Sequence, residues 1–466
     1  MKFINAEEAV KLIKNNTNLI ISGFGNYSYP KTLLTELRNS FDKTNNPNNL
    51  NIITGISAGN LSYDDEGLNN IANPNLIKSI ITTHTGMCKT MAEMLSEIES
   101  YTIPLGVYLE LLDAIARNKE FIITKTGLNT YCDPRLEGCR ASQKANKEIV
   151  EIINKNKQQY LLYKCFDIDV CFVKLDICDK NGNATFNNNS IITDAFDIIM
   201  ATYAKKGIVI VEVEEVVDNL EYNNVIVPNF LIDYIVIGQK EKTSKNNLNE
   251  EITENRLLCA KRAFQEIKDN DIINLGVGMP DSLSKLITDK NKQVNLTIES
   301  GFGGGIPNTK EYFGTTTNPK YKLSLFNMLK LYQAKVLDIA FLGAAQIDEH
   351  GNVNVSKFGK RIVGPGGFID IVTNTKKIVF MTSFLTKDNK YKFRKNIDQI
   401  TFASINAIND NIEVLYITDI CVFKLTNNNL KLIEINDNIN IGKDILDKME
   451  FKPEIDAKLL SQRKEE

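Results

Sequence analysis

The chain has 466 residues, of which 43% are hydrophobic, and its 55 basic and 58 acidic side chains nearly balance. This length predicts two to four domains with sizeable cores. The balanced charge argues against a protein that binds nucleic acid or an anionic membrane. No apolar run approaches the roughly 20 residues that cross a bilayer. We therefore expect a cytoplasmic protein with neither nucleic acid nor membrane among its partners.

Residues 1–16, MKFINAEEAVKLIKNN, predict an amphipathic helix and not a signal peptide, because no uninterrupted apolar stretch follows. Residues 19–37 predict an apolar strand, a Gly-x-Gly turn and, after a proline, a helix. Residues 49–57 predict another strand that enters a turn.

An internal repeat begins near residue 169. Residues 169–184, DVCFVKLDICDKNGNA, match residues 338–353, DIAFLGAAQIDEHGNV, at a constant offset, and in each half a β-rich run follows a Lys-Lys pair. The offset is 169 residues for five matched positions: Asp169, Phe172, Asp179, Gly182 and Asn183 with Asp338, Phe341, Asp348, Gly351 and Asn352. The shared Asp-x-x-Gly-Asn predicts a tight turn between two extended runs.

The second half repeats the opening pattern of the first. Residues 272–287 again predict an apolar strand, Gly-x-Gly, a proline and a helix, and residues 294–302 predict the next strand. Strands that alternate with helices indicate a largely parallel sheet in each half. The polar segment 239–251 is the predicted linker, so we expect two α/β domains over 1–238 and 252–466.

Neither Gly-x-Gly turn completes a dinucleotide-binding motif. In G-x-G-x-x-G the sixth position is glycine, whereas this chain has Ser28 and Asp281 there, and no acidic residue is placed to bind a ribose. NAD binding is therefore disfavoured. Both turns join a strand to a helix, and their backbone amides could also face an anionic or carbonyl ligand.

The nucleophile candidates are carboxylates, because the chain has only two histidines and no Cys-x-x-Cys pair. A Cys/His metal site and a Ser-His or Cys-His triad are both improbable. We expect His84 to be a hydrogen-bonded loop residue and His350 to face solvent. Several of the eight cysteines lie in apolar runs, where a free cysteine behaves as a small buried side chain.

Glu299 is the most conspicuous carboxylate. It ends the strand in LTIESGFGGG, beside four glycines, and alignment of the two halves places it near Gly55 and Ile56, where no carboxylate occurs. A residue that only finishes a strand would be expected in both copies, so the difference favours a chemical role. The cluster GPGGFID at 364–370 is either a tight loop or a ligand-contacting loop.

Segments along nearly the whole chain carry a family resemblance: ISGFG (21–25), GLNTYCDPRLEG (127–138), VIVEVEEVV (209–217), INLGVGMP (273–280), ESGFGGGIP (299–307), LDIAFLGAAQIDEHGNVNVSKFG (337–359) and GPGGFI (364–369). Together they resemble the family I coenzyme A transferases, and more closely the single-chain 3-oxoacid or acetate/propionate type. The resemblance implies two related open α/β domains fused in tandem, with the active site in the cleft between them.

The resemblance further implies that Glu299 is the nucleophile. Its carboxylate would attack an acyl-CoA thioester to form an acyl-glutamyl anhydride, the released thiolate would form a glutamyl-CoA thioester, and an acceptor acid would reverse both steps. Because a carboxylate is ionised at neutral pH, no basic residue is needed. The remaining implied site residues are Gly366 and Gly367, whose amides would lie beside the thioester, and Asn274, Leu275, Gly276, Val277 and Gly278 on the acyl and CoA side.

The implied substrates are short-chain acyl-CoA esters, such as acetyl-, propionyl-, butyryl- or acetoacetyl-CoA, and free carboxylic acids. Coenzyme A is then a substrate, so neither a cofactor nor a metal is expected. The resemblance also implies a homo-oligomer, either a dimer or a tetramer.

Several positions depart from the family pattern and put acyl specificity in question. Ala334, Lys335 and Val336 stand where relatives commonly have glycines, and Leu105 and Asp113 stand where relatives often have glutamine and arginine. Arg135 leaves two roles open, because it could pair with Asp133 or help to order the cleft.

Two other functions compete with CoA transfer. An acyl-CoA hydrolase on the same scaffold would release CoA without an acceptor acid. A metabolite-sensing module is a further alternative, since related α/β folds also serve as effector domains, but no helix-turn-helix or basic segment precedes the first domain.

Overall fold

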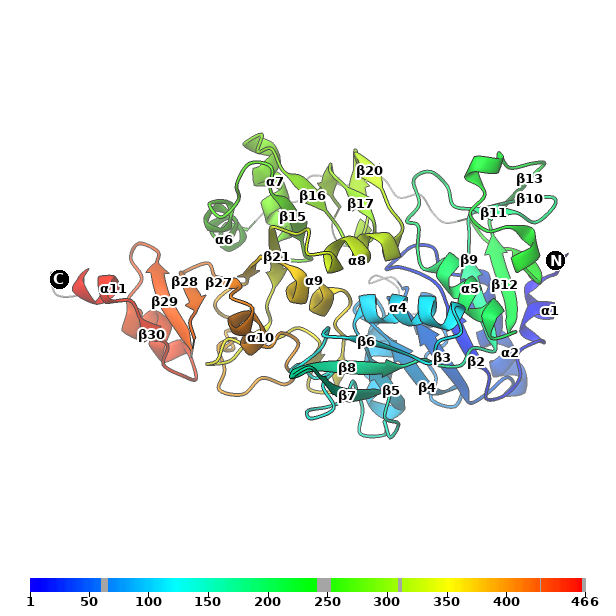
Figure 1. The fold of residues 1–466 in the computed structure, drawn as a ribbon, viewed down its shortest axis with the longest axis horizontal. Helices are drawn as coiled ribbons and strands as arrows, with labels where there is room; N and C mark the ends of the chain where they lie inside the picture. Colours follow the sequence, from blue (N-terminus) through cyan, green and yellow to red (C-terminus); the bar gives the residue numbers. More distant parts are fainter. Residues whose placement is uncertain (60–65, 241–252, 309–311, 428, 463–466) are drawn as a thin grey trace.

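Figure 1 shows a computed structural model of the chain, which describes residues 1–59, 66–240, 253–308, 312–427 and 429–462. The two halves of the chain lie side by side along the longest axis of the molecule, the first drawn in blue to green and the second in green to red. Each half is built around a large sheet with helices packed against it. The predicted α/β class and its two related halves are confirmed.

The first half contains an eight-stranded sheet in which every neighbouring pair is parallel. The strands, in spatial order, are β1 (Lys2–Phe3), β14 (Tyr234–Ile237), β12 (Ile208–Val213), β9 (Val170–Lys174), β2 (Asn18–Ile21), β3 (Leu50–Thr54), β4 (Ile77–Thr82) and β5 (Glu99–Thr102). Every residue of β9 is buried, as expected for a parallel strand that is covered on both faces.

One helix of the first half begins where the sequence predicts it. Helix α2 starts directly after Pro30, whereas the helix predicted over 1–16 is limited to five residues, because Lys2–Phe3 instead extend the sheet by pairing with β14. The helices are α1 (Ala6–Val10), α2 (Lys31–Thr44), α3 (Lys89–Met94), α4 (Leu105–Ala116) and α5 (Ala195–Ala204), with short helical turns at Gly67–Asn69, Leu95–Glu97, Tyr222–Asn224 and Asn229–Leu231.

The second half contains a ten-stranded mixed sheet. Its parallel centre consists of β16 (Asn295–Thr297), β15 (Ile272–Leu275), β21 (Ile339–Gly343), β26 (Lys377–Met381) and β27 (Glu413–Ile417). Antiparallel strands extend both edges of this centre: β17 (Phe302–Gly303) and β20 (Tyr321–Lys322) on one side, and β28 (Cys421–Leu425) and β29 (Leu430–Ile435) on the other, where β30 (Glu454–Ile455) adds a parallel edge.

The helices of the second half follow the same alternation. They are α6 (Glu254–Phe264), α7 (Asp281–Asp289), α8 (Leu325–Gln333), α9 (Phe368–Asn374), α10 (Ser404–Asn409) and α11 (Ala457–Gln462), with short helical turns at Ile441–Ile445 and Leu446–Lys448. Helix α7 follows Pro280, as predicted.

The strand order confirms the internal repeat. The order β14-β12-β9-β2-β3 in the first half corresponds to β27-β26-β21-β15-β16 in the second. The registers agree as well: Leu19 pairs with Ile52 and Val170, and Ile273 pairs with Leu296 and Ile339. Ile52 and Leu296 are therefore equivalent, and three residues further on Glu299 occupies the position of Gly55.

The Asp-x-x-Gly-Asn segments form the predicted turns. Asp179 and Asp348 each accept two backbone N–H groups from their own turn. Gly182 and Gly351 adopt φ angles of 90° and 83°, which favour glycine. The turns join β10 (Ile177–Asp179) to β11 (Ala184–Thr185) and β22 (Gln346–Ile347) to β23 (Val353–Asn354); β13 (Glu215–Val217) pairs with β10.

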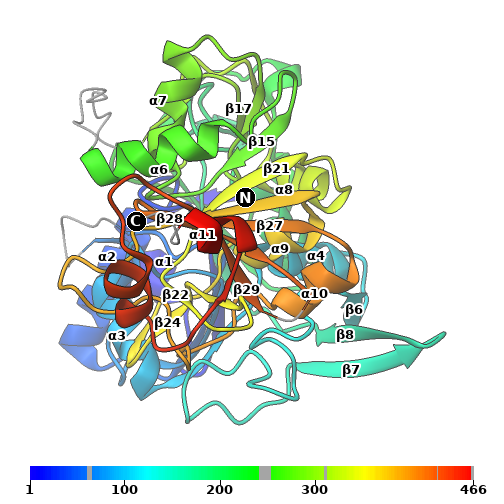
Figure 2. The ribbon, with the colours of Figure 1, turned by 90° about the vertical axis from the view of Figure 1, so that its left-hand side faces the viewer.

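Both halves also contain smaller sheets. Figure 2 shows one of them projecting from the body of the molecule, built from β6 (Phe121–Thr124), β8 (Gln158–Lys164) and β7 (Val150–Lys155). Two hairpins lie in the second half: β18 (Ile306–Pro307) with β19 (Thr316–Thr317), and β24 (Lys357–Phe358) with β25 (Arg361–Ile362).

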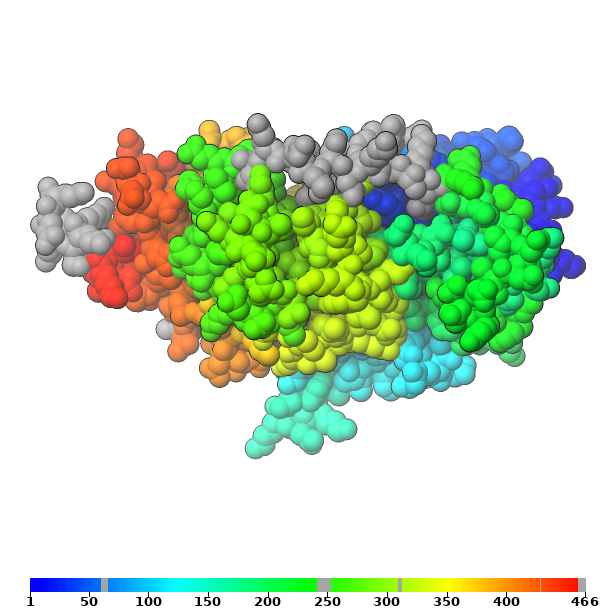
Figure 3. Space-filling view, turned by 90° about the horizontal axis from the view of Figure 1, so that it is seen from above, coloured from blue at the N-terminus to red at the C-terminus, as the bar shows by residue number. Residues whose placement is uncertain are grey.

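The two halves share one hydrophobic core. A single cluster of buried residues includes Tyr108 and Leu112 of α4 together with Met328 and Leu329 of α8. The halves accordingly form a continuous body in the space-filling view (Figure 3). The predicted linker at 239–251 lies, from residue 241 on, outside the described residues, so the domain boundaries stay a prediction.

Candidate active site

A turn that only glycine fits places Glu299 at the edge of the second sheet. Strand β16 ends two residues before Glu299, and the chain then reverses into β17. Gly301 sits in this turn with a φ of 111°, and a Cβ added there would lie 2.2 Å from the carbonyl oxygen of Leu323. The turn thus fixes where the preceding carboxylate can point.

The Glu299 carboxylate lies against Gly367, the residue that caps the N-terminus of α9. The Gly367 N–H donates a hydrogen bond to this carboxylate, and a Cβ added at Gly367 would lie 2.3 Å from Glu299 Oε2. Glycine is therefore required here for the close approach of the carboxylate, and not for the backbone, because its φ is an ordinary −84°. Of the two amides predicted beside the thioester, this one faces the carboxylate.

The pKa of Glu299 is raised to about 7. Burial raises it, because the ionised form loses hydration, and the hydrogen bond from Gly367 lowers it by a smaller amount. The side chain keeps limited exposure on the side that faces the cavity described below. Near neutral pH the carboxyl group therefore exists in both forms, whereas the sequence alone predicts a fully ionised nucleophile.

A cavity of about 460 Å³ opens in front of Glu299, between the two halves of the chain. The first half contributes Ile56, His84, Gly86 and Met87. From the second half come most of the predicted site residues and a largely apolar wall: Asn274, Leu275, Gly276, Val277, Ile298, Glu299, Phe313, Leu342, Gly343, Ala344, Ala345, Val355, Phe358, Gly364, Pro365, Gly366, Gly367, Phe368 and Ile371. Glu299 is the one carboxylate in this set, and among the described lining residues there is neither lysine nor arginine.

Gly278 differs from the other predicted site residues, because it does not line the cavity. Its N–H donates to the Asp281 carboxylate over 2.9 Å, and its carbonyl oxygen accepts a hydrogen bond from the Arg256 guanidinium. Its φ of 95° explains the glycine. In this structure the second glycine of the Gly-x-Gly pair shapes the turn, while Gly276 faces the cavity.

Asn274 lines the cavity with a buried side chain that two neighbours, Thr297 and Tyr332, hold. Its amide nitrogen donates to the carbonyl oxygen of Thr297 over 3.4 Å. Its amide nitrogen donates to the Tyr332 hydroxyl over 3.0 Å, and that hydroxyl donates to Thr297 Oγ1 over 3.1 Å. The side-chain carbonyl oxygen of Asn274 is buried and accepts no hydrogen bond from the described residues. The side chain is thus fixed in orientation and retains one free acceptor.

Gly366 joins the two halves through both of its backbone polar groups. Its N–H donates to the carbonyl oxygen of Thr83 over 2.9 Å, and its carbonyl oxygen accepts from the N–H of Leu105 over 2.9 Å. The sequence predicts this N–H beside the thioester, but in the structure it is already used. The Gly366 N–H therefore bonds to the first half, whereas the Gly367 N–H bonds to Glu299.

His84 lies on the cavity wall beside Gly366, where an added Cβ would be 3.7 Å from the Cβ of His84. Its Nδ1 accepts a hydrogen bond from the N–H of Gly86 over 3.2 Å, so the neutral ring carries its proton on Nε2. Burial, with the nearby charge of Arg361 as a smaller cause, lowers its pKa to about 4. The expected loop hydrogen bond is confirmed, and the position on the cavity wall is what sequence reasoning missed. His350 is mostly exposed, as predicted.

Asp370, in the first turn of α9, was also missed by sequence reasoning. Its buried carboxyl group accepts a hydrogen bond from the N–H of Gly106 over 2.9 Å, at the start of α4 in the other half. Burial and the neighbouring carboxyl groups of Glu110 and Glu299 raise its pKa. This hydrogen bond attaches α9, the helix that Gly367 caps, to the first half. No local sequence pattern predicts this role of Asp370, because the two bonded residues lie in different halves.

The first half holds an inverted version of the pair formed by Glu299 and Gly367. A Cβ added at Gly55 would lie 3.0 Å from the carboxylate of Asp194, which caps α5 as Gly367 caps α9. Asp194 is fully buried and accepts a hydrogen bond from the Tyr108 hydroxyl over 3.0 Å. A carboxylate and a glycine thus face each other in both halves, but the elements that carry them are exchanged.

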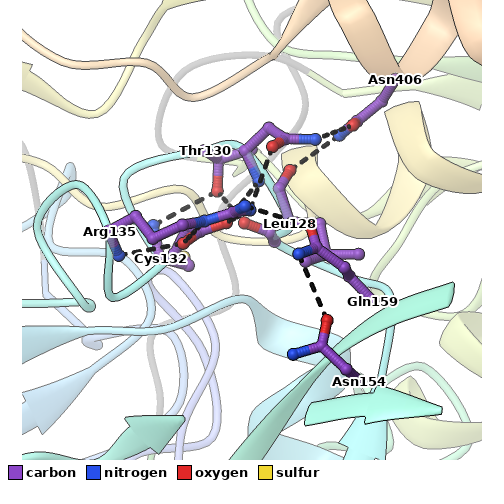
Figure 4. A network of polar contacts seen from close by, with 10 residues as sticks. Leu128, Thr130, Cys132, Arg135, Asn154, Gln159 and Asn406 are labelled. Atoms are coloured by element: carbon purple, nitrogen blue, oxygen red, sulfur yellow. Dashed lines mark hydrogen bonds and ion pairs between the residues drawn. The ribbon is translucent and has the colours of Figure 1, made fainter. Parts of the chain in front are cut away.

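Arg135 forms the ion pair with Asp133 that the sequence left as one alternative (Figure 4). Its guanidinium also donates to Asn129 Oδ1 over 3.2 Å and to Gln159 Oε1 over 3.0 Å. From Asn129 the network crosses into the second half, where Asn129 donates to Asn406 Oδ1 over 2.7 Å. The other alternative, that Arg135 helps to order the cleft, is thus also supported, because Arg135 stabilises the Asn129 side chain that contacts the second half.

Other possible functional groups are few. All eight cysteines are free thiols, and all but Cys165 are buried. The described part of the chain contains no group of three or more His, Cys, Asp or Glu side chains placed to hold a metal ion. Within the same residues, no helix combines the length and apolar character needed to cross a membrane.

The chain is similar to known proteins along nearly its whole length. The family model for coenzyme A transferase matches residues 3–238 and 258–442. The chain is 33% identical to caffeate CoA-transferase of Acetobacterium woodii, over 98% of this chain and 96% of that protein. It is 31% identical to the acetate CoA-transferase YdiF of Escherichia coli K12, over 99% and 94% of the two chains. A crystal structure of the E. coli O157:H7 acyl-CoA transferase YdiF, as a thioester complex with CoA, superposes with a TM-score of 0.90 at 30% identity, covering 98% of this chain and 94% of that one.

Proposed function

The chain belongs to the coenzyme A transferase family and is an enzyme of that class, and from this premise we propose that it exchanges CoA between a short-chain acyl-CoA and a free carboxylic acid. The observation that carries the proposal is the placement of Glu299. Its carboxylate faces a cavity between the halves and accepts a hydrogen bond from a backbone N–H at a helix N-terminus.

In the proposed reaction Glu299 forms two covalent intermediates. One carboxylate oxygen attacks the thioester carbon, the carbon–sulfur bond breaks, and an acyl-glutamyl anhydride and CoA thiolate result. The thiolate then attacks the glutamyl carbonyl, which forms the glutamyl-CoA thioester and releases the donor acid. The acceptor carboxylate attacks that thioester, and the same two steps in reverse return the free Glu299 carboxylate and the new acyl-CoA.

The residues around Glu299 suit this chemistry. The developing negative charge of each addition step requires fixed donors, and a backbone N–H in such a position contributes about 2.7–4 kcal/mol. Gly367 is the backbone donor adjacent to the carboxylate. The ionised fraction of Glu299 near pH 7 supplies the nucleophile without a separate base, and the proposal needs neither a metal nor a cofactor beyond CoA itself.

The cavity wall favours acids with one carboxyl group and a short apolar chain. Its described lining is mainly aliphatic and aromatic, and it offers no cationic partner for a second carboxylate. Burying an unpaired charge is strongly unfavourable. Acetate, propionate, butyrate and acetoacetate therefore remain the proposed substrates, and we expect the enzyme to act in the cytoplasm as a homo-oligomer.

Trapping of CoA on the protein tests this proposal. Incubation with acetyl-CoA alone should add the mass of CoA less one water to the peptide that contains Glu299, and free acetate should remove that label and appear as new acetyl-CoA. The Glu299→Gln variant should remain unlabelled. An unlabelled wild-type peptide would contradict the proposal. CoA release that does not depend on acetate would instead identify an acyl-CoA hydrolase.

A further inference from the structure

His84 follows β4 of the first half, but its neighbours in the chain are bonded to the second half. The carbonyl oxygen of Thr83 accepts a hydrogen bond from the N–H of Gly366 over 2.9 Å, and the N–H of Thr85 donates to the carbonyl oxygen of Val363 over 2.7 Å. Two backbone hydrogen bonds thus fix His84 against the loop that leads into α9. The first half supplies the imidazole, and contacts with the second half position it.

The imidazole ring of His84 packs between two glycines. A Cβ added at Gly86 would lie 2.3 Å from its Cε1, and a Cβ added at Gly366 would lie 3.8 Å from its Cδ2. Its Nδ1 accepts the Gly86 N–H, so the proton of the neutral ring is on Nε2. None of the described residues accepts a hydrogen bond from this Nε2–H, and His84 lines the cavity. A fixed donor is therefore open to a bound substrate.

No other side chain in the described cavity wall has a free donor. The polar side chains among its lining residues are those of His84, Asn274 and Glu299. Both amide hydrogens of Asn274 are engaged, one by the carbonyl oxygen of Thr297 over 3.4 Å and one by the Tyr332 hydroxyl over 3.0 Å. The ionised Glu299 only accepts. His84 is thus the one described lining residue whose side chain can donate to a substrate.

The proposed reaction places negative charge on two different oxygens. When Glu299 attacks the thioester, or when the thiolate attacks the acyl carbon of the anhydride in the last step, the charge develops on the acyl oxygen. When the thiolate or the acceptor acid attacks the glutamyl carbonyl, the charge develops on a Glu299 oxygen. The Gly367 N–H already bonds to the Glu299 carboxylate and suits that second oxygen. The acyl oxygen needs a donor of its own.

We propose that the Nε2–H of His84 donates to the acyl oxygen of the substrate and stabilises the oxyanion that forms there. This inference rests on the proposed function, since it assigns a donor to two steps at the same site. In the first step the carbonyl electron pair moves onto the acyl oxygen as the bond from Glu299 forms, and it returns as the carbon–sulfur bond breaks. His84 keeps its proton throughout. Burial lowers the pKa of His84 to about 4, so the ring is a neutral donor near pH 7.

Three replacements of His84 differ in where they place a donor. The amide nitrogen of glutamine reaches about as far from the backbone as Nε2, that of asparagine only as far as Nδ1, and leucine has no donor. In His84→Leu and His84→Asn, kcat for CoA exchange from acetyl-CoA to propionate should fall about a hundredfold, as expected for the loss of an oxyanion donor, with an unchanged KM. In His84→Gln, kcat should stay within about tenfold of the wild-type value. His350→Gln is the matched control, because the His350 side chain is exposed and its replacement should leave kcat unchanged.

Cleavage by hydroxylamine separates the two oxyanions. Wild type and His84→Leu are first incubated with acetyl-CoA until Glu299 carries CoA. Hydroxylamine then attacks the glutamyl carbonyl, forms a hydroxamate and releases CoA as the thiol. Labelling should be about a hundredfold slower in His84→Leu than in wild type. CoA release by hydroxylamine should proceed at the wild-type rate, because its oxyanion forms on Glu299.

Three results would overturn the assignment to His84. They are wild-type exchange rates in His84→Leu, a His84→Gln variant that is no faster than His84→Leu, and equal losses of labelling and of hydroxylamine cleavage in His84→Leu. If the wild-type protein takes up no CoA at Glu299, the proposed function itself fails, whatever the His84 variants do.

Discussion

Replacing Glu299 with glutamine should stabilise the protein at high pH. The Glu299 carboxyl group has an ordinary pKa of 4.5 and a pKa of about 7 in the fold. It therefore holds its proton more tightly in the folded chain than in the unfolded one. Its stabilising contribution is fully present below pH 4.5 and is lost as the pH rises through 7. Glutamine cannot ionise, and it keeps an oxygen that can accept the Gly367 N–H.

The size of the effect follows from the same two values. Their difference, at about 1.36 kcal/mol for each pKa unit, corresponds to about 3 kcal/mol as an upper bound, because water in the cavity hydrates part of the ionised group. The free energy of unfolding of Glu299→Gln minus that of wild type should therefore be smallest below pH 4.5. It should rise by up to about 3 kcal/mol towards pH 8.

Urea unfolding of both proteins at several pH values measures this difference. Glu93→Gln serves as the control, because Glu93 is an exposed glutamate on α3 and its replacement should leave the pH dependence unchanged. The same Glu299→Gln sample should have lost CoA exchange. A difference in unfolding free energy that does not vary with pH would refute the view that burial of Glu299 disfavours its ionised form.

Three variants or conditions bear on the reaction, and one on stability. The rate of CoA exchange at low substrate concentration should rise with pH and reach half its maximum at about pH 7, because only the ionised Glu299 attacks in the proposed reaction. A rate that does not change from about pH 5 to 9 would contradict this expectation. Gly367→Ala should lower kcat about a hundredfold without unfolding the chain, because its Cβ would displace the Glu299 carboxylate. Succinate should be a poorer CoA acceptor than butyrate by at least about tenfold, as initial rates would show, because the described cavity wall has no cation for its second carboxylate. Lys335→Gly should stabilise the protein by about 1 kcal/mol in urea unfolding with unchanged exchange, because Lys335 has a φ of 58° just after α8.

The sequence alone predicts the repeat, the α/β class and the position of the key carboxylate. Regular spacing carries that information: an offset of 169 residues, a turn motif in both copies and a strand that runs into glycines. The strand registers agree with the alignment and place Glu299 at the position of Gly55. Lys335 is also explained locally, since it follows the end of α8 with a left-handed φ of 58°, the conformation that favours the glycine expected from the resemblance.

Contacts between the two halves could not be predicted from the sequence. The use of the Gly366 N–H by Thr83, the attachment of Asp370 to Gly106 and the place of His84 on the cavity wall all join residues more than two hundred positions apart. No local pattern records such a contact, because it depends on how two finished sheets pack together. The extent of burial is unpredictable for the same reason, and with it the raised pKa of Glu299.

The exchanged places of carboxylate and glycine in the two halves have a stoichiometric consequence. Asp194 is fully buried and accepts a hydrogen bond from the Tyr108 hydroxyl, whereas its counterpart Glu299 lines the cavity between the halves. In the proposed reaction Glu299 is therefore the acceptor of the covalent label in each polypeptide, even though the architecture is duplicated. Saturating amounts of acyl-CoA should load one equivalent of CoA per chain, however many subunits assemble.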